Sequence, residues 1–358
     1  MSRQVTATIN LEALRHNLQQ ARDRVSDQTQ VVAVIKANGY GHGLLTVAHA
    51  LYQADMFAVG CLDEAVQLRS AGVQKPILLL EGFEGEEELH AASQLDLQTV
   101  VHSKEQWSLL KSTHLKRSLV VWLKVDSGMH RLGFYPQRVD QLLPLMEESS
   151  CVDQLVLISH FANADKPDHK MNQQQQELFE TSGQQLDIRR SMANSAALLS
   201  DNSTHYDFVR PGIMLYGGSP FSQQSADSIG LKPVMTLKAP LIAVKKLQRG
   251  DCVGYGSTWC APEDMSIGVV AIGYGHGYPR SLPTGTPVLI RDQRVPLVGR
   301  VSMDMITVDL TEVPDAMVGD RAILWGDGLP IEEIADKADT ISYELLCQLT
   351  SRVRREEG

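Results

Sequence analysis

The stretch VVAVIKANGYGHG, residues 31–43, decides the fold class of this chain. Five apolar residues run without interruption into Lys36, and three glycines follow within seven residues. A short apolar run without polar alternation predicts a buried strand of a parallel sheet. A lysine at the end of such a strand is usually a solvated surface residue, whereas a partly desolvated lysine is a neutral amine that can form a Schiff base. The remaining sequence must decide between these two interpretations.

Similar apolar runs, separated by single helical segments, fill the first two thirds of the chain. The helical segment 11–25 follows Asn10, a suitable N-cap, and its leucines recur at helical spacing. The further strand-like runs are residues 57–60, 76–80, 97–101, 119–126, 155–161 and 205–210. About eight βα units fit before residue 233, which predicts an α/β fold with a closed (β/α)8 barrel of the TIM type. A doubly wound open sheet is the alternative, but no GxGxxG follows the first strand.

After Pro233 the sequence changes to strand-like segments that are separated by Gly, Pro and Asp turns. Helical periodicity returns only near residues 330–338 and 342–353. This change predicts two domains, a barrel domain over 1–233 and a mostly β C-terminal domain over 234–358. The leading segment QVTATIN alternates and is expected to pair with the β domain, and the terminal SRVRREEG is expected to be a solvated tail.

Charge and cysteine content limit the classes of partner. The chain has 33 Lys and Arg against 43 Asp and Glu, a formal charge of -10, which disfavours nucleic acid and anionic membranes as partners. There is no signal-peptide core and no run of ~18 apolar residues, so we expect a cytoplasmic protein without a membrane span. The five cysteines form no CxxC pair, and no histidines accompany Cys252 and Cys260, so we expect reduced thiols and no metal site.

The strand ends carry the side chains that suggest chemistry, because barrel enzymes build their sites at the carboxyl ends of the strands. These positions hold Lys36, Lys124, Arg131, His160, Asn194, Ser195, Arg210, Gly212 and Ile213. A serine at a helix start beside a glycine turn suits a phosphate. A lysine and a phosphate cradle on one rim are the two attachments that pyridoxal phosphate (PLP) requires. Taken singly, Asn194–Ser195 is equally an N-cap, His160 a satisfied core histidine, and Lys124 with Arg131 a structural pair.

Nine motifs in order resemble those of the bacterial alanine racemases, over nearly the whole chain. They are KANGYGHG, KVDSGMHRLG, SHFANAD, ANSAA, VRPGIMLYG, VGYGSTW, GYGHGYPR, VGRVSMDMITVD and ISYELL. The resemblance implies a PLP-dependent isomerase, a barrel joined to a β domain, and a homodimer. Each active site would lie between the barrel of one subunit and the β domain of the other, and the enzyme would supply D-alanine for peptidoglycan.

Carried over by residue, the resemblance implies that Lys36 and Tyr255 of the partner subunit are the two catalytic bases. The residues around PLP would be Lys36, Tyr40, His160, Asn194, Ser195, Arg210, Gly212, Ile213 and Tyr343. Arg131 and Met303 would meet the substrate carboxylate, and Lys124 matches a lysine that is carbamylated in some members. Tyr274, Arg280 and Arg300 would line the corridor by which substrate enters, with Asp304 close by. The sequence departs from many relatives at His276, which replaces Asp, and from some at Ser302, which replaces Cys.

Racemisation requires two bases on opposite faces of the α-carbon. A phenol, which titrates near ~10, needs nearby cations such as His160 or an arginine to act as one of them. Arg210 only donates hydrogen bonds, so at the cofactor ring nitrogen it would oppose protonation and suppress transamination. Large corridor residues favour a small substrate such as alanine. The alternatives are a broader amino-acid racemase acting on, for example, serine, a decarboxylase of the same architecture, a non-catalytic PLP-binding barrel, and a metabolite-binding barrel without PLP.

Overall fold

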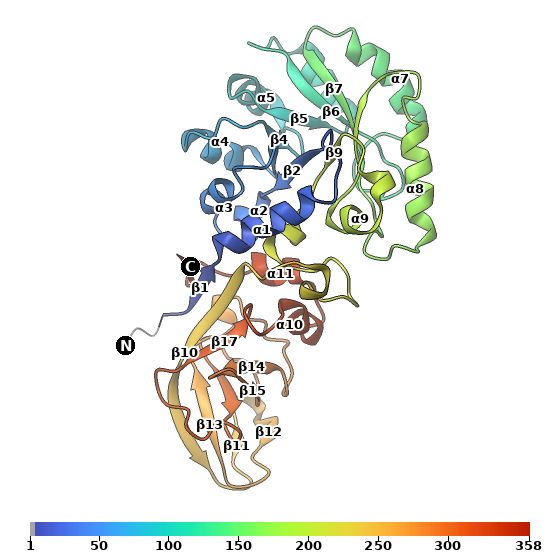
Figure 1. Cartoon of the computed structure of the whole chain (residues 1–358). Coiled ribbons are helices and arrows are strands. Elements are labelled where there is room, and N and C mark those ends of the chain that lie inside the picture. Colours follow the sequence, from blue (N-terminus) through green and yellow to red (C-terminus); the bar gives the residue numbers. More distant parts are fainter. Residues whose placement is uncertain (1–3) are drawn as a thin grey trace. The chain divides into compact units, whose positions relative to one another are not determined.

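The computed structural model describes residues 4–358, which form two compact units (Figure 1). The barrel unit comprises Arg15–Gly39 and Leu44–Leu215. The β unit comprises the described residues up to Leu14 together with Tyr40–Gly43 and Tyr216–Gly358. Within residues 4–358, no helix combines the length and the apolar character that a membrane crossing requires.

Eight parallel strands close the barrel unit. They are β2 (Gln30–Val34), β3 (Met56–Val59), β4 (Ile77–Leu79), β5 (Gln98–Val101), β6 (Leu119–Lys124), β7 (Val152–Ile158), β8 (Arg189–Ser191) and β9 (Phe208–Val209). Each strand pairs with the next in sequence, and β2 pairs with β9 through Gln30 opposite Phe208 and Val31 opposite Val209. The predicted closed barrel is therefore confirmed, and the open sheet is wrong.

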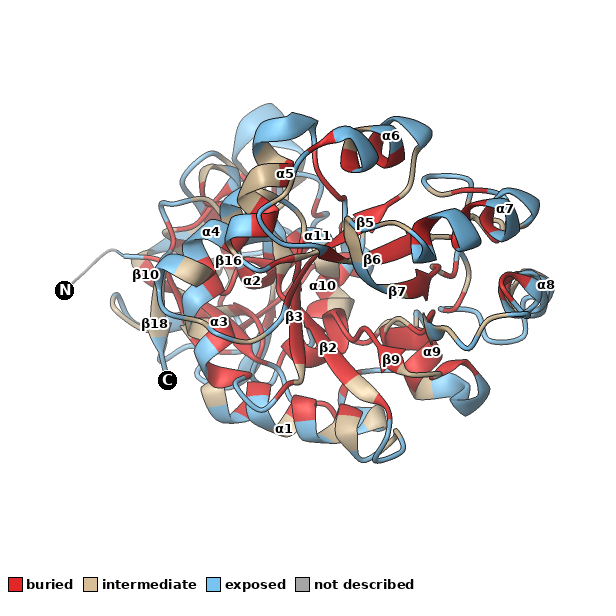
Figure 2. Cartoon of the chain, turned by 90° about the horizontal axis from the view of Figure 1, so that it is seen from above, coloured by how far each residue is buried: buried red, intermediate tan, exposed pale blue. Residues whose placement is uncertain are grey.

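One helix precedes the first barrel strand, two follow that strand, and one follows each of the next six strands. They are α1 (Leu11–Arg22), α2 (Lys36–Tyr40), α3 (Leu44–Ala50), α4 (Leu62–Ser70), α5 (Gly85–Gln94), α6 (Lys104–Ser112), α7 (Pro136–Glu147), α8 (Lys170–Thr181) and α9 (Ser195–Ser200), with the 3-10 turns η1 (Asn202–Thr204) and η2 (Ile213–Tyr216). Asn10 caps α1, since its Oδ1 accepts from Ala13 N at 2.9 Å. Figure 2 shows the barrel strands mostly as buried residues and the outward faces of α3 to α8 as exposed ones. This burial of apolar strands favours barrel closure, because each buried Val or Leu side chain contributes roughly 1.5–3 kcal/mol to the stability of the fold.

Strand β8 was missed in the sequence because its residues, Arg189–Ser191, are polar. The guanidinium of Arg190 donates to the carbonyl oxygens of Phe179 at 2.9 Å and Ser182 at 2.8 Å. The guanidinium of Arg189 lies 3.9 Å from the centroid of the Phe208 ring. Carbonyl oxygens and an aromatic face thus stabilise the two charged side chains. The strand can therefore form although its sequence is not an apolar run.

The β unit contains one large sheet and one small hairpin. Its strands are β1 (Thr6–Ile9), β10 (Met235–Leu247), β11 (Cys252–Val253), β12 (Trp259–Cys260), β13 (Met265–Val270), β14 (Pro287–Ile290), β15 (Gln293–Pro296), β16 (Ile306–Asp309), β17 (Arg321–Trp325) and β18 (Arg354–Glu357). The main order is β15-β14-β17-β10-β1-β18, with β13 between β10 and β16, and β11 pairs only with β12. The short helical elements are η3 (Asp227–Ile229), η4 (Tyr255–Ser257), η5 (Tyr274–His276), α10 (Ile331–Lys337) and α11 (Ser342–Cys347). The predicted pairing of the leading segment is confirmed, because β1 joins the sheet at β10.

Two sequence-based expectations are wrong in the β unit. The terminal SRVRREEG is not a solvated tail, because β18 pairs in parallel with β1, Thr6 opposite Arg354 through Ile9 opposite Glu357. The expectation of reduced thiols fails for Cys252 and Cys260, which are joined by a disulfide. They stand directly opposite each other in the β11–β12 ladder, a proximity that a spacing of eight residues does not reveal. Cys61, Cys151 and Cys347 are not part of a disulfide.

Candidate active site

Lys36 stands directly after β2 in a backbone turn of unusual hand. Ala37, Asn38 and Gly39 have φ of 54°, 55° and 60° with ψ near 50°, so the turn α2 winds to the left. Left-handed backbone costs roughly 1–2 kcal/mol for a residue with a side chain, and such strain gathers at functional sites. A Cβ added to Gly39 would lie 2.8 Å from Val47 Cγ2, so glycine is required there.

The left-handed turn is held by side-chain hydrogen bonds. Asn38 Oδ1 accepts from Leu44 N at 2.9 Å, which ties the turn to the start of α3. The carboxylate of Glu64 accepts from Asn38 N at 3.0 Å and from Gly60 N at 3.0 Å, which ties it to the end of β3. Neither Asn38 nor Glu64 was singled out in the sequence, although Asn38 stands within the motif itself. These bonds fix the backbone from which the half-buried Lys36 amine projects.

Arg210, after β9, is a buried cation held by neutral acceptors. Its guanidinium donates to Ser191 Oγ at 2.6 Å, to the Ser159 carbonyl at 2.6 Å and to the Met192 carbonyl at 3.3 Å. Its Nη2 also lies 3.3 Å from His160 Nδ1. Burial lowers the pKa of Arg210 to about 10, so the group remains charged at neutral pH. The structure therefore joins Arg210 and His160 at one end of the barrel, as the sequence predicted.

The neighbouring groups form one positive cluster. Burial, followed by the charges of Arg210, Arg131 and Lys36 and against the opposing effect of Asp126, lowers the pKa of Lys124 to about 7. Burial, followed by the charges of Lys124, Arg210, Arg131 and Lys36, holds the pKa of His160 well below its usual range. His160 is consequently neutral at physiological pH, and the expectation that it supplies a cation is wrong. The positive charge of this cluster therefore comes from its other members and not from His160.

Replacing Lys124 with methionine should stabilise the fold in a pH-dependent way. The pKa of Lys124 is lowered from 10.5 to about 7, so between these values the unfolded chain binds more protons at this group than the folded chain does. The resulting destabilisation is full below pH 7 and disappears as pH rises to 10.5. Lys124→Met should therefore raise Tm by a few degrees at pH 6, with no gain near pH 10.5, in thermal melts in CO2-free buffer.

The exposed Lys111 provides the matched control, since Lys111→Met should leave Tm nearly unchanged throughout. A gain in Tm from Lys124→Met that stays constant from pH 6 to pH 10.5 would contradict the lowered pKa.

The residues predicted to hold a phosphate meet at the start of α9. The Asn194 side chain accepts from Ala197 N at 3.1 Å and caps the helix, as predicted. Ser195 Oγ accepts from Gly212 N at 2.8 Å and from Met214 N at 3.4 Å, so α9 is joined to the turn that precedes η2. The Ser195 hydroxyl keeps its own hydrogen for donation to an anion. Ser195, Gly212 and Ile213 are all buried, which would shield a bound phosphate from water.

Tyr40 and Tyr343 belong to the β unit, where their ring centroids lie 6.1 Å apart. Tyr40 also stacks on Tyr216, with a centroid distance of 4.5 Å. Burial, then Tyr343 and Cys347, raises the pKa of Tyr40 above its ordinary value. Tyr40 therefore stays a neutral phenol that can donate a hydrogen bond.

The remaining predicted site residues lie at exposed positions of the β unit: Tyr255 (70% exposed), Tyr274, Arg280, Arg300 and Met303. Hydrogen bonds from Tyr274 N to Ser302 O at 3.1 Å and from Gly275 N to Met303 O at 2.9 Å bring two of their loops together. A Cβ added to Gly256 would lie 3.7 Å from Arg300 Nη1, so Arg300 packs against the turn of Tyr255.

His276, the departure from the family pattern, is buried within this β-unit group. Gly273 N donates to its Nδ1 at 3.3 Å. Burial, followed by the Arg352 charge, lowers the pKa of His276, while Asp304 opposes this effect. Asp304 is itself ion-paired with Arg352 at 2.7 Å. The imidazole is therefore a neutral structural group of the loop, and the negative charge nearby comes from Asp304.

The donor set suits an aldehyde cofactor that carries a phosphate. The barrel unit offers an amine, a buried guanidinium and a hydroxyl-lined cradle. Within residues 4–358 no group of three or more His, Cys, Asp or Glu side chains is arranged to hold a metal ion.

Comparison with known proteins places the chain in a family. The family model described as alanine racemase, N-terminal domain, matches residues 9–220, and that described as alanine racemase, C-terminal domain, matches residues 234–357. The alanine racemases of Vibrio cholerae serotype O1 and Nitrosococcus oceani are both 50% identical, over 97% and 98% of this chain and 96% and 98% of their own lengths. The crystal structure of biosynthetic alanine racemase from Pseudomonas aeruginosa matches with a TM-score of 0.97 at 46% identity, and covers 100% of both chains. The chain, as its motifs and strand-end residues indicated, belongs to the alanine racemase family, a family of isomerases.

Proposed function

We propose that this protein interconverts L-alanine and D-alanine with PLP attached through Lys36. The observation that carries the proposal is the gathering of Lys36, Lys124, Arg131, His160 and Arg210 at one end of the barrel unit. PLP, when bound, withdraws electrons from the substrate and makes its α-proton acidic. Tyr40, Asn194, Ser195, Gly212, Ile213 and Tyr343 would surround the phosphate, with the Ser195 hydroxyl as one donor to it.

Lys36 and Tyr255 of the partner subunit are the proposed pair of bases. Each would take the α-proton from one face of the substrate or return it to that face. Lys36 projects from a turn held by hydrogen bonds, which fixes the backbone position from which its side chain extends. A second base on the opposite face must come from another element, and the exposed Tyr255 phenol is suited to reach a second chain. We therefore propose a homodimer in which each active site is shared between subunits.

Arg210 is proposed to set the reaction type. Its guanidinium can donate hydrogen bonds but contains no atom that accepts one. It keeps its charge at neutral pH, because its lowered pKa is still about 10. Placed at the cofactor ring nitrogen, it would oppose ring protonation and so moderate electron withdrawal. Proton return would then be favoured over transamination. Because the guanidinium is fixed by Ser191 and Ser159, its direction is set before substrate binds.

Arg131 and Met303 are the proposed contacts of the substrate carboxylate. Lys124, with a pKa of about 7, has a large neutral fraction at physiological pH, and a neutral amine can add CO2 to form a carbamate. The carbamate would carry a negative charge beside Arg131 and Arg210 and would orient Arg131. Tyr274, Arg280 and Arg300 would line the corridor through which alanine enters.

The cellular setting is part of the same proposal. A cytoplasmic enzyme that makes D-alanine would supply peptidoglycan synthesis. The division into a PLP-binding domain over 1–233 and a β-strand domain over 234–358 stays a prediction.

Alanine racemisation in deuterated water tests the function. The purified protein with PLP should convert L-alanine to a racemic mixture with deuterium at the α-carbon, and should do the same from D-alanine. Serine and larger amino acids, assayed in parallel by chiral chromatography, should react far more slowly. Comparable rates for serine would favour the broader racemase. The absence of racemisation with every amino acid, by a folded protein that binds PLP, would refute the proposal.

A further inference from the structure

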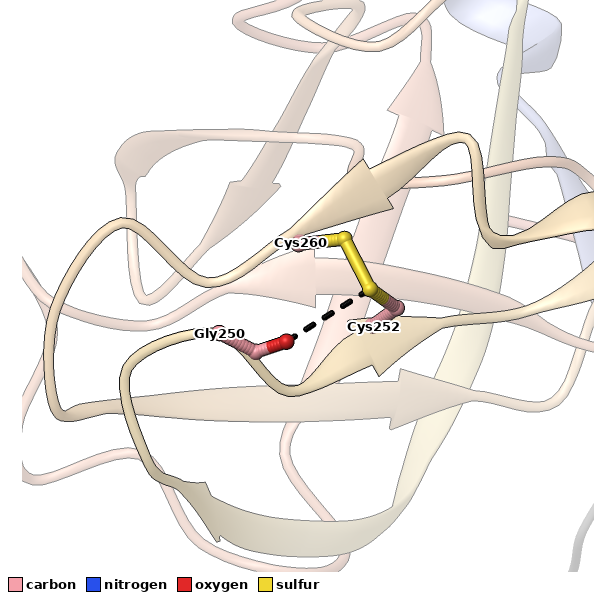
Figure 3. The surroundings of a disulfide bond; sticks show 3 residues. All are labelled: Gly250, Cys252 and Cys260. Carbon is pink, nitrogen blue, oxygen red and sulfur yellow. Dashed lines mark hydrogen bonds between the residues drawn. A yellow bond between two sulfur atoms is a disulfide. The ribbon is translucent and has the colours of Figure 1, made fainter.

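Tyr255 lies within a ring of the chain that a disulfide closes. Strands β11 and β12 are two residues each, with Cys252 opposite Cys260 and Val253 opposite Trp259. Figure 3 shows the two cysteines joined across these neighbouring strands. The segment between them, residues 253–259, carries Tyr255 in the turn η4. The position of the phenol therefore depends on how firmly this hairpin is held.

Backbone hydrogen bonds also hold the base of the hairpin, from Gly250 N to Ala261 O and from Ala261 N to Asp251 O, each at 2.8 Å. A two-residue ladder is shorter than ordinary strands and contributes little stability alone. Within the turn, Gly254 and Gly256 have φ of 75°, and Ser257, which has a side chain, has φ of 47°. Backbone of this kind persists only where its surroundings hold it. The disulfide excludes the open conformations in which the two strands separate and the turn relaxes.

Both cysteines are accessible for exchange. Cys252 and Cys260 are exposed, and exposed disulfides are the ones that cellular thiols reduce most readily. The sulfur of Cys252 lies 3.5 Å from the carbonyl oxygen of Gly250 (Figure 3), where the thiol of the reduced form can donate a hydrogen bond. The structure thus offers an acceptor for one thiol once the bond is broken.

We propose that Cys252 and Cys260 form a reversible redox site that controls the position of Tyr255. A dithiol reductant attacks one sulfur as a thiolate, the S–S bond breaks, and the other cysteine leaves as a thiolate and takes a proton. The second thiol of the reagent then displaces the first cysteine, so two electrons pass to the protein and the reagent becomes a disulfide. A small disulfide such as oxidised glutathione reverses the reaction and is released as two thiols.

The oxidised hairpin holds the phenol in place, and the reduced hairpin lets it move. The inference about catalysis rests on the proposed role of Tyr255, whereas the redox site itself does not. Reduction should therefore affect the reaction steps that need Tyr255 more than the steps that need Lys36. A general loss of stability would instead lower the rates of the Tyr255-dependent and the Lys36-dependent steps equally.

The test compares the PLP-bound protein after dithiothreitol, after oxidised glutathione, and as the Cys252→Ser/Cys260→Ser variant. Peptide mapping follows the bond, amide hydrogen exchange follows residues 253–259, and α-proton exchange in deuterated water is measured from each alanine enantiomer. The enantiomer whose proton Tyr255 removes is identified with Tyr255→Phe. Cys151→Ser is the control, because Cys151 is a free cysteine that precedes β7.

Reduction should break the bond and raise amide exchange in residues 253–259. It should slow the Tyr255-dependent direction about tenfold, since even an ångström of misplacement is costly, and the other direction by less than about twofold. Oxidised glutathione should restore the original values, the double variant should match the reduced protein under both reagents, and Cys151→Ser should respond like the parent.

Two free thiols after oxidised glutathione, or unchanged amide exchange and proton-exchange rates after proven reduction, would overturn the redox site. If the disulfide is intact and amide exchange in residues 253–259 is slow, but the protein does not racemise alanine, the proposed function is refuted. The redox site would then still be supported by peptide mapping and amide exchange.

Discussion

Replacing Lys36 with alanine is expected to abolish the visible absorbance of the PLP-loaded protein and to lower racemisation by more than about 10⁴-fold. The substitution removes the amine that attaches the cofactor and also one proton-transfer group, which alone accounts for roughly 10²–10⁴ in rate. The backbone turn should survive, because Asn38 and Glu64 hold it and the Lys36 side chain does not. Absorbance spectra before and after borohydride, with peptide mapping of the reduced protein, measure the attachment directly.

Lys111→Ala is the matched control for this prediction, since Lys111 is an exposed lysine of α6. Its spectrum, its borohydride-labelled peptide and its activity should equal those of the parent. An unchanged visible band in Lys36→Ala, or a label found on another lysine, would show that the attachment has been assigned to the wrong residue.

Replacing Tyr255 with phenylalanine should affect the two directions of proton exchange unequally. The ring remains and only the hydroxyl is lost, so the folding of the hairpin should be kept. α-Proton exchange from one alanine enantiomer should fall by about 10²–10⁴-fold, while exchange that uses Lys36 alone should continue at a much smaller loss. Net racemisation, which needs both faces, should fall with the slower direction. Initial deuterium incorporation from each pure enantiomer, followed by proton NMR, gives both rates.

Tyr274→Phe is a useful comparison for Tyr255→Phe, because it removes a hydroxyl from the proposed corridor instead of from a proposed base. It should change KM more than it changes the ratio of the two exchange rates. Equal losses in both directions from Tyr255→Phe would mean that the scheme of two bases on two faces is wrong.

Most of the barrel could be predicted because its strands are recognisable in the sequence as apolar runs. Residues 31–35 and 119–123 are apolar because parallel barrel strands are covered on both faces, and the structure has strands there, β2 over Gln30–Val34 and β6 over Leu119–Lys124. Strand β8 could not be predicted from an apolar run, because it contains Arg189 and Arg190, whose charges are stabilised by carbonyl oxygens and an aromatic ring. Strand β18 could not be predicted either, because an edge strand beside β1 needs backbone pairing and little apolar character.

The places of the candidate site residues in the barrel could be predicted because motif position and strand end coincide. The supporting groups could not be: Ser191 and Ser159 orient Arg210, yet an isolated serine in a sequence carries no such signal. The neutral state of His160 is likewise invisible in sequence, since it follows from burial among Lys124, Arg210 and Arg131. The disulfide was missed for a similar reason, because it depends on strand register. These features arise from tertiary neighbours, which local patterns do not contain.

The central claim, an active site shared between two subunits, is tested most directly by mixing two inactive chains. Lys36→Ala and Tyr255→Phe subunits, dissociated and allowed to reassemble, should recover about a quarter of parental activity, since half of the dimers are mixed and each holds one intact site of two. Either chain mixed with the Lys36→Ala/Tyr255→Phe double variant can form no intact site and should stay inactive. Recovery near a quarter would support the shared site, and no recovery after subunit exchange has been demonstrated by mass spectrometry would contradict it.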